Sequence, residues 1–385
     1  MGCSETTENN VVNENSTMGA QQQNSDPQYT SALFNLPGEL RNHIYTILFN
    51  STRLTFGRRT FGQKTPRWIK PAANALSILR SCRRAHAEAK DLWLEHVMFN
   101  FERTEDLMDK LSALPAETFA AIRHVRTSAR PIMMTPPGDY DDVFYKVPYV
   151  LKLLPGLRLD TLTILGDTGA DSLYRTIELF VEHGHGWKEL RVISPSSAVL
   201  SWIAENSIFG PPSYQRKPQP GTWHSALLRR DGLDSRAFVK AYRAKTLESG
   251  SVLRRCEREP YHQKMKSLGE AENFGKEPVQ EFQAKDEMGK ELLIVVRRGH
   301  RADLSDMGIV QRNDLSDLRV WSDEMSWKEI KRDCIDHGLG SSSEDDDTSG
   351  NDDNGDELDV PHDDMYDDPD EYEFPGFLRA RICED

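Results

Sequence analysis

Apolar residues near the start of the chain recur with the period of one helix face. Leu36, Leu40, Ile44 and Leu48 follow one another at intervals of four residues, which is the spacing of an amphipathic α-helix. Pro37 stands where a helix start tolerates proline, because the first turn needs no amide hydrogen from it and its fixed φ is already helical. The pattern predicts a helix with one apolar face, which serves either as a first core helix or as a surface for a partner.

A second helical pattern follows a polar insertion at residues 51–74. Its small and apolar residues recur at helical spacing: Leu76, Leu79, Cys82, Ala85, Ala89 and Leu92. After them Val97, Phe99 and Phe101 alternate with other residues, which is typical of a strand. We therefore expect a compact helical module over residues 31–102. Residues 1–30 contain no Leu, Ile or Phe, so we expect a disordered N-terminal tail.

From residue 103 the pattern changes to alternating helices and short apolar strands. Helical segments near 104–119, 144–157 and 172–184 each precede a strand, and the expected strands begin at Ile122, Leu159 and Trp187. A further strand at 291–299 is apolar enough to be central. Residues 210–290 predict a long excursion with one weak strand at 235–244. The fold class expected is α+β, with a helical N-terminal module, an α/β region of degenerate repeat-like strand and helix units over 103–340, and disordered termini.

The charge of the chain is concentrated at its C-terminal end. The formal net charge is -14, but 16 acidic residues and no Lys or Arg lie between Glu344 and Glu373. Without them the 48 basic residues face 46 acidic ones, so the rest of the chain is almost neutral. We expect residues 341–385 to be an acidic disordered tail. In it Ser341, Ser342 and Ser343 each stand three residues before an acid, which is typical of phosphorylation sites for acidophilic kinases.

Cysteine usage and hydropathy favour a reducing compartment. The five cysteines form no C-x-x-C pair, so neither a disulfide framework nor a zinc module is predicted. No apolar run reaches the roughly 18 residues of a membrane span, and the first residues lack the basic start and apolar middle of a secretory signal. The expected location is cytoplasmic or nuclear.

The first residues nevertheless match an acylation signal. Gly2 and Thr6 fit the pattern for N-myristoylation, and Cys3 could take palmitate. One myristoyl chain binds membranes only marginally, so Cys3 would make the anchor stable. The alternative is that this short sequence matches the acylation pattern by chance within a polar tail. The alternative function is a peripheral membrane scaffold, and lipidation is the only route by which we expect a membrane partner.

One short string matches the signature of retroviral-type aspartic proteases. Asp167, Thr168 and Gly169 follow an apolar run, as the catalytic Asp does in those enzymes. No second such string exists in the chain, so a catalytic pair would need a dimer. The residues that follow have helical spacing where the protease fold requires strands. A strand-to-helix turn, with Asp or Thr capping the next helix, explains the letters better, and protease activity stays a remote alternative.

Other chemical motifs are weak or missing. Nine basic residues and no acidic one lie between Arg53 and Ala87, with aromatics interleaved, which favours phosphate binding, a solvated loop or a docking place for the acidic tail. Because the body is almost neutral, nucleic acid is not an expected partner. His183 and His185 lack further metal ligands nearby, and no phosphate-binding loop or nucleophile elbow occurs. We expect no cofactor, no metal and no enzymatic activity.

Taken together, the opening helix and its continuation resemble a group of fungal F-box-like proteins. The first half of the group's pattern falls on Leu36, Pro37, Glu39, Leu40, Arg41, Asn42, Ile44 and Tyr45. Its second half falls on Leu79, Cys82, Arg83, Glu88, Ala89, Phe99, Asn100 and Phe101. The insertion at 51–74 is a departure, because a compact F-box lacks it.

The resemblance implies a protein-interaction function without catalysis. In F-box proteins the Leu-Pro helix packs on the Skp-type adaptor of a cullin RING ubiquitin ligase, and the C-terminal region holds a protein substrate. Carried over, Leu36, Pro37, Leu40 and Ile44 would form the adaptor-binding surface through hydrophobic burial. The alternative, which the insertion leaves open, is that the helices close into a core of their own and use the same leucines internally.

Overall fold

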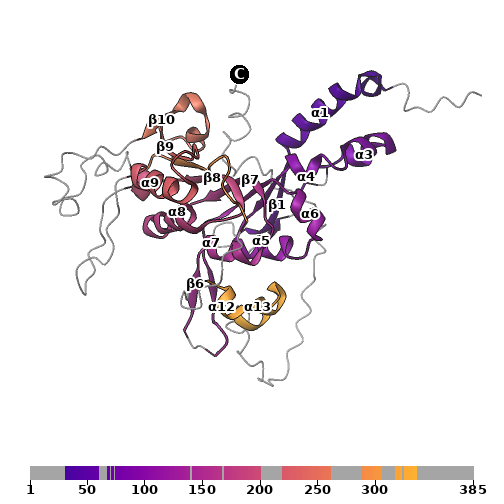
Figure 1. Ribbon diagram of the computed structural model, residues 1–385. Coiled ribbons are helices and arrows are strands. Elements are labelled where there is room, and N and C mark those ends of the chain that lie inside the picture. The colour runs from indigo at the N-terminus through magenta and orange to yellow at the C-terminus, as the bar shows by residue number, and fades with distance from the viewer. Residues whose placement is uncertain are drawn as a thin grey trace, which may run out of the picture. The chain divides into compact units, whose positions relative to one another are not determined.

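The structure is a computed structural model that describes residues 31–59, 67–69, 71–72, 74–138, 141–166, 169–200, 219–261, 288–305, 317–322 and 325–335 (Figure 1). The chain divides into two compact units, residues 1–44 and 45–385, and each is described by itself. The expected tails and the acylation and phosphorylation sites lie outside the described residues.

The described part of the first unit holds the start of the predicted helix. A short 3₁₀ helix at Ala32–Asn35 is followed by α1 (Gly38–Ser51), which continues into the second unit. The helix begins directly after Pro37, and the Pro37 carbonyl accepts the amide of Arg41 at 3.2 Å. The Arg41 guanidinium donates to the Leu36 carbonyl. The predicted helix and the place of the proline at its start are confirmed.

The second unit is built on one mixed sheet of nine strands. Their order in space is β10 (Arg258–Tyr261), β9 (Phe238–Ala244), β11 (Leu292–Arg297), β8 (Trp187–Ser194), β7 (Leu159–Leu165), β4 (His124–Ser128), β3 (Met98–Phe101), β1 (Arg53–Arg59) and β2 (Arg67–Ile69). Strands β1, β3, β4, β7 and β8 lie side by side in the sheet in the same order as along the chain, and they run parallel. The remaining pairs are antiparallel.

Consecutive parallel strands need crossover connections, and right-handed crossovers in one direction place their helices on one face. The helices along the sheet in Figure 1 are α5 (Thr104–Leu111), α7 (Val147–Val150), α8 (Ala170–His183) and α9 (Gly221–Asp231). One apolar row crosses seven strands in register, and every member is at most 7% exposed: Leu54, Phe99, Val125, Leu162, Leu190, Val296 and Val239. This row is the centre of the core.

The adjacent row, one residue further along each strand, points to the opposite face and is polar. Thr55, Asn100, Arg126 and Thr163 stand side by side on β1, β3, β4 and β7, and each is at most 4% exposed. Asn100 donates to the Thr55 hydroxyl at 3.2 Å and accepts from Arg126 Nε at 2.7 Å. These bonds join three neighbouring strands in one register.

The remaining elements are short. They are α2 (Ile78–Ser81), α3 (Arg83–Ala89), α4 (Trp93–His96), α6 (Ala116–Ala121), α12 (Arg319–Ser322), α13 (Trp327–Cys334), a hairpin of β5 (Ile132–Met134) and β6 (Val143–Tyr145), and the 3₁₀ helices at Leu151–Leu153, Ser197–Leu200, Ser251–Leu253 and Arg255–Glu257. Trp327 Nε1 and Lys331 Nζ donate to Asp109 of α5 at 2.7 and 2.6 Å. The C-terminal helices are therefore held against α5.

The α+β class and the strands expected at Ile122, Leu159, Trp187 and residues 291–299 are confirmed, the last as a central strand between β8 and β9. The structure differs at the predicted helical module over 31–102. Residues 53–59 of the insertion form β1, and β1 pairs in parallel with β3. The sheet thus incorporates part of the module, because Leu54 extends the buried apolar row.

The excursion predicted for 210–290 is also partly folded. Its described residues include α9, β9 and β10, and these strands extend the sheet beyond β11. Burial explains why: Trp223, Leu227 and Ala241 are at most 1% exposed. The helix predicted for 104–119 is split into α5 and α6, and the one predicted for 144–157 shortens to α7 and a 3₁₀ turn after β6.

Candidate docking surface

The face of α1 that carries the regular apolar stripe is open to solvent. Leu40 is 51% exposed, Ile44 40%, Ile47 56% and Leu48 40%. Leu36 is half-buried and Pro37 exposed. Leu40, Ile44, Ile47 and Leu48 fall at i, i+4, i+7 and i+8, so they share one helix face. Of the two alternatives left open for this stripe, use in a core of the module's own does not fit these exposures. Leu40, Ile44, Ile47 and Leu48 together are named the α1 apolar face.

The side of α1 that is buried carries aromatic residues. Tyr45 and Phe49 are fully buried, and the Tyr45 hydroxyl donates to Glu88 of α3 at 3.2 Å. Glu88 also accepts from Arg84 Nε at 3.2 Å. The large rings of Tyr45 and Phe49 bury more surface than the aliphatic residues, so they take the core position.

The acylation candidates Gly2 and Cys3, the phosphorylation candidates Ser341, Ser342 and Ser343, and the protease candidate Asp167 all lie outside the described residues. The predicted change from strand to helix is confirmed, because β7 ends at Leu165 and α8 begins at Ala170. Gly169 is the N-cap residue of α8, and the predicted capping by Asp167 or Thr168 falls on residues outside the described ones.

No cluster of metal-ligating side chains occurs in the part of the chain that the structure describes. There, no three His, Cys, Asp or Glu side chains stand together in a way that could hold a metal ion. A membrane-spanning candidate is missing too, since none of the described helices combines the required length and apolar character.

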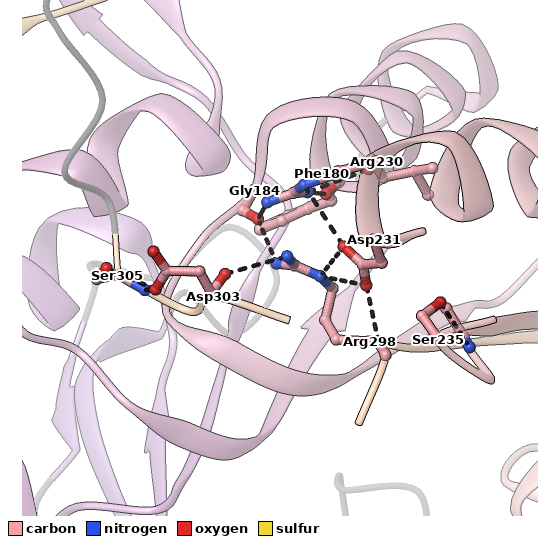
Figure 2. A network of polar contacts seen from close by, with 11 residues as sticks. Phe180, Gly184, Arg230, Asp231, Ser235, Arg298, Asp303 and Ser305 are labelled. Carbon is pink, nitrogen blue, oxygen red and sulfur yellow. Dashed lines mark hydrogen bonds and ion pairs between the residues drawn. The ribbon is translucent and has the colours of Figure 1, made fainter. Parts of the chain in front are cut away.

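A polar network at one end of α8 and α9 was not predicted. Asp231 ends α9, and its buried carboxylate accepts from Arg298 Nε at 2.9 and 2.8 Å and from the Gly299 amide at 2.8 Å. Figure 2 shows the guanidinium of Arg298 reaching from there to the carbonyls of Gly184 and Asp303. Arg230 donates to the carbonyls of Phe180 and Gly184 at the end of α8.

This network is a structural junction. Its buried charges are paired and hydrogen-bonded, as buried ions must be. An open cavity of about 500 Å³ adjoins it, lined by Asp231, Gly232, Leu233, Asp234, Ser235, Arg236, His300 and Arg301. Arg298 and Gly299 already occupy the Asp231 carboxylate in the wall of this cavity. The only sequence signal was the apolar strand 291–296 followed directly by two arginines.

Comparison of the chain with protein-family models, with curated proteins and with solved structures finds no match.

Proposed function

We propose that this chain is a non-enzymatic substrate adaptor that docks the α1 apolar face on the Skp-type adaptor of a cullin RING ubiquitin ligase. The observation that carries the proposal is the exposure of Leu40 and Ile44, at 51% and 40%. Both stand on the Leu-Pro motif that the F-box-like pattern uses for docking. A helix that used these side chains in its own core would bury them.

The α1 apolar face has the anatomy of a binding surface. Its large aliphatic side chains form a connected stripe, and the exposed polar residues Glu39 and His43 flank it. Apolar centres with polar rims are typical of protein interfaces. Burial of the exposed half of four such side chains would contribute about 3–6 kcal/mol, which is a substantial part of a micromolar affinity.

The buried side of α1 supports presentation of this face. Tyr45 and Phe49 are fully buried, and the hydrogen bond from Tyr45 to Glu88 ties the helix to α3. The helix is thereby anchored through residues that the docking face does not use. In this proposal the sheet region after residue 102 serves as the platform for a protein substrate.

Co-purification of the tagged full chain with the Skp-type adaptor tests the proposal. We expect the wild type to capture the adaptor and both Leu40→Asp and Ile44→Asp to lose it. A carboxylate placed in an apolar interface costs at least about 3 kcal/mol, which weakens binding roughly 100-fold. Asn42→Asp is the matched control, because it adds the same charge at an exposed position on the opposite side of the helix from Leu40 and Ile44 and should leave capture unchanged.

Circular dichroism melts of all four proteins check that the fold survives each change. Surface substitutions of this kind normally alter stability only slightly. Failure of the folded wild type to capture the adaptor would overturn the proposal. Equal capture by the wild type and the two Asp variants would show that docking does not use the α1 apolar face.

A further inference from the structure

The β5–β6 hairpin presents an apolar pair to solvent. Met133 is 49% exposed and Phe144 is 62% exposed, and the two residues are directly opposite each other in the register. Side chains opposite each other in an antiparallel pair lie in contact distance, and methionine sulfur packs favourably against aromatic rings. This Met133–Phe144 pair is an apolar surface on the outer face of the hairpin.

The inner face of the hairpin is already covered. Tyr145 is 2% exposed, and its hydroxyl accepts from Trp321 Nε1 of α12 at 2.9 Å. The amide of Thr135, directly after β5, donates to the carbonyl of Cys334 at 2.9 Å. The last described helix therefore ends beside the hairpin, as Figure 1 shows for α12, α13 and β6, and the chain continues from that place into residues 336–385.

Charge distinguishes between parts of that remaining chain. Asp141 and Asp142 are exposed immediately before β6, so they repel the stretch 344–373, which has 16 acidic residues and no basic one. The segment 374–381 has the opposite character. Its sequence FPGFLRAR combines two phenylalanines and a leucine with Arg379 and Arg381, which suits an apolar pair next to two carboxylates.

The connecting chain is long enough for this contact and short enough to favour it. Residues 336–373 separate the described end of the chain from the segment. A flexible chain of that length has a root-mean-square span of about 31–37 Å. Tethered beside the loop that joins β5 to β6, the segment is present at an effective concentration of about 1 mM.

We propose that residues 374–381 bind the Met133–Phe144 pair of the same chain, with Arg379 and Arg381 beside Asp141 and Asp142. The contact closes the acidic stretch into a loop that starts and ends at the hairpin. This surface belongs to a different element from the α1 apolar face, and the inference does not depend on the proposed ubiquitin-ligase role.

Oxidation of Met133 in the full chain reports on the contact. Hydrogen peroxide is added, and sulfoxide formation at each methionine is followed by mass spectrometry. At an effective concentration of about 1 mM, a contact with a Kd of about 0.3 mM covers the pair roughly three-quarters of the time. We therefore expect the double variant Phe377→Asp/Leu378→Asp to oxidise Met133 about fourfold faster than the wild type does. Met134, which is fully buried, is the internal control.

The matched control variant is Tyr366→Asp/Tyr372→Asp, which adds the same two charges to the tail outside the segment. The inference is supported if Met133 oxidises as slowly in this control as in the wild type, and if the slow rate persists on dilution. Equal Met133 rates in all three proteins overturn it. Protection that disappears on dilution also overturns it, because the segment of a second copy would then be the occupant.

Discussion

At the scale of single residues, buried polar side chains in the sheet help to determine which residues of adjacent strands pair with each other. Asn100 was noted in the sequence only as part of a resemblance, and the structure shows what it does. It bonds Thr55 on one side and Arg126 on the other, from strands that are 45 and 26 residues away in the chain. Because a buried polar atom without a partner is costly, these bonds favour one register of β1, β3 and β4.

Asp317 is a residue whose charge stabilises the fold. Burial opposes its ionisation, but hydrogen bonds from Arg319 and Lys152 outweigh that effect and lower the pKa of the carboxyl from 3.8 to about 2. A native pKa below the unfolded one stabilises the protein above pH 4, and this contribution is lost as the pH falls toward 2. The shift corresponds to about 2 kcal/mol.

We therefore predict that Asp317→Asn lowers the free energy of unfolding by about 2 kcal/mol at pH 6. At pH 3 the difference from the wild type should shrink, because the Asp317 carboxyl is then mostly protonated in the unfolded chain while it is still mostly ionised in the native one. Urea unfolding of both proteins at the two pH values measures this. A difference that is equal at both would show that the charge of Asp317 is not what stabilises the fold.

At the scale of elements, amphipathicity describes α1 only in part. Its apolar residues cover more than one side, so periodicity could place the helix but could not choose between the aliphatic face and the Tyr45–Phe49 face. Packing against α3 decides that choice. Of the two buried rings, Tyr45 carries a hydroxyl, and this hydroxyl donates a hydrogen bond to Glu88.

The junction of α8, α9 and β11 is centred on the buried carboxylate of Asp231, which pairs with Arg298 and also lies 4.0 Å from Arg230 Nε. Arg298 and Asp231 have side chains that are 4% and 0% exposed. We predict that Asp231→Asn lowers the free energy of unfolding by about 3–5 kcal/mol, since it leaves the guanidinium buried without its counter-charge. Thermal or denaturant unfolding measures the loss.

The double variant Asp231→Asn/Arg298→Met is the control for this interpretation. It removes both charges and keeps an apolar stem of similar length in place of Arg298. We expect it to be more stable than Asp231→Asn alone, because a buried pair costs most when only one partner is removed. A double variant that is less stable than the single one would contradict the role assigned to the pair.

At the scale of the whole second unit, the nine-stranded sheet makes its parts interdependent. The apolar row continues from Leu54 on β1 to Val239 on β9 without a gap. The boundary expected near residue 102 therefore falls inside the sheet, between β3 and β4, which pair in parallel. Such a boundary would expose a sheet edge along β4.

We predict that a chain beginning at residue 103 does not reach a stable fold. It lacks Leu54, Phe99 and Phe101, which are 5%, 7% and 1% exposed in the full chain. Loss of three large core side chains costs roughly 6–15 kcal/mol, which matches or exceeds the stability of a typical domain. Circular dichroism and gel filtration of the two chains, compared at equal concentration, measure the outcome. A folded, monomeric truncated chain would show that the sheet does not need β1 and β3.

The sequence by itself determined the features that depend on neighbouring residues. The start of α1 at Pro37, the helix α8 and the strands β4, β7, β8 and β11 follow from local periodicity, because a helix or strand repeats its pattern within a few residues. The weak strand signal at 235–244 was also right, since β9 lies there. The hairpin residues Met133 and Phe144 gave no such signal in their short strands.

Only the tertiary structure decided the features that depend on distant contacts. Tertiary packing decides three such features. They are the exposure of Leu40 and Ile44, the entry of β1 into the sheet, and the pairing of Asp231 with Arg298, 67 residues away. Periodicity shows that a face is apolar, but it does not show which surface covers it. For this reason the sequence could indicate an apolar face on α1, while its exposure had to come from the fold.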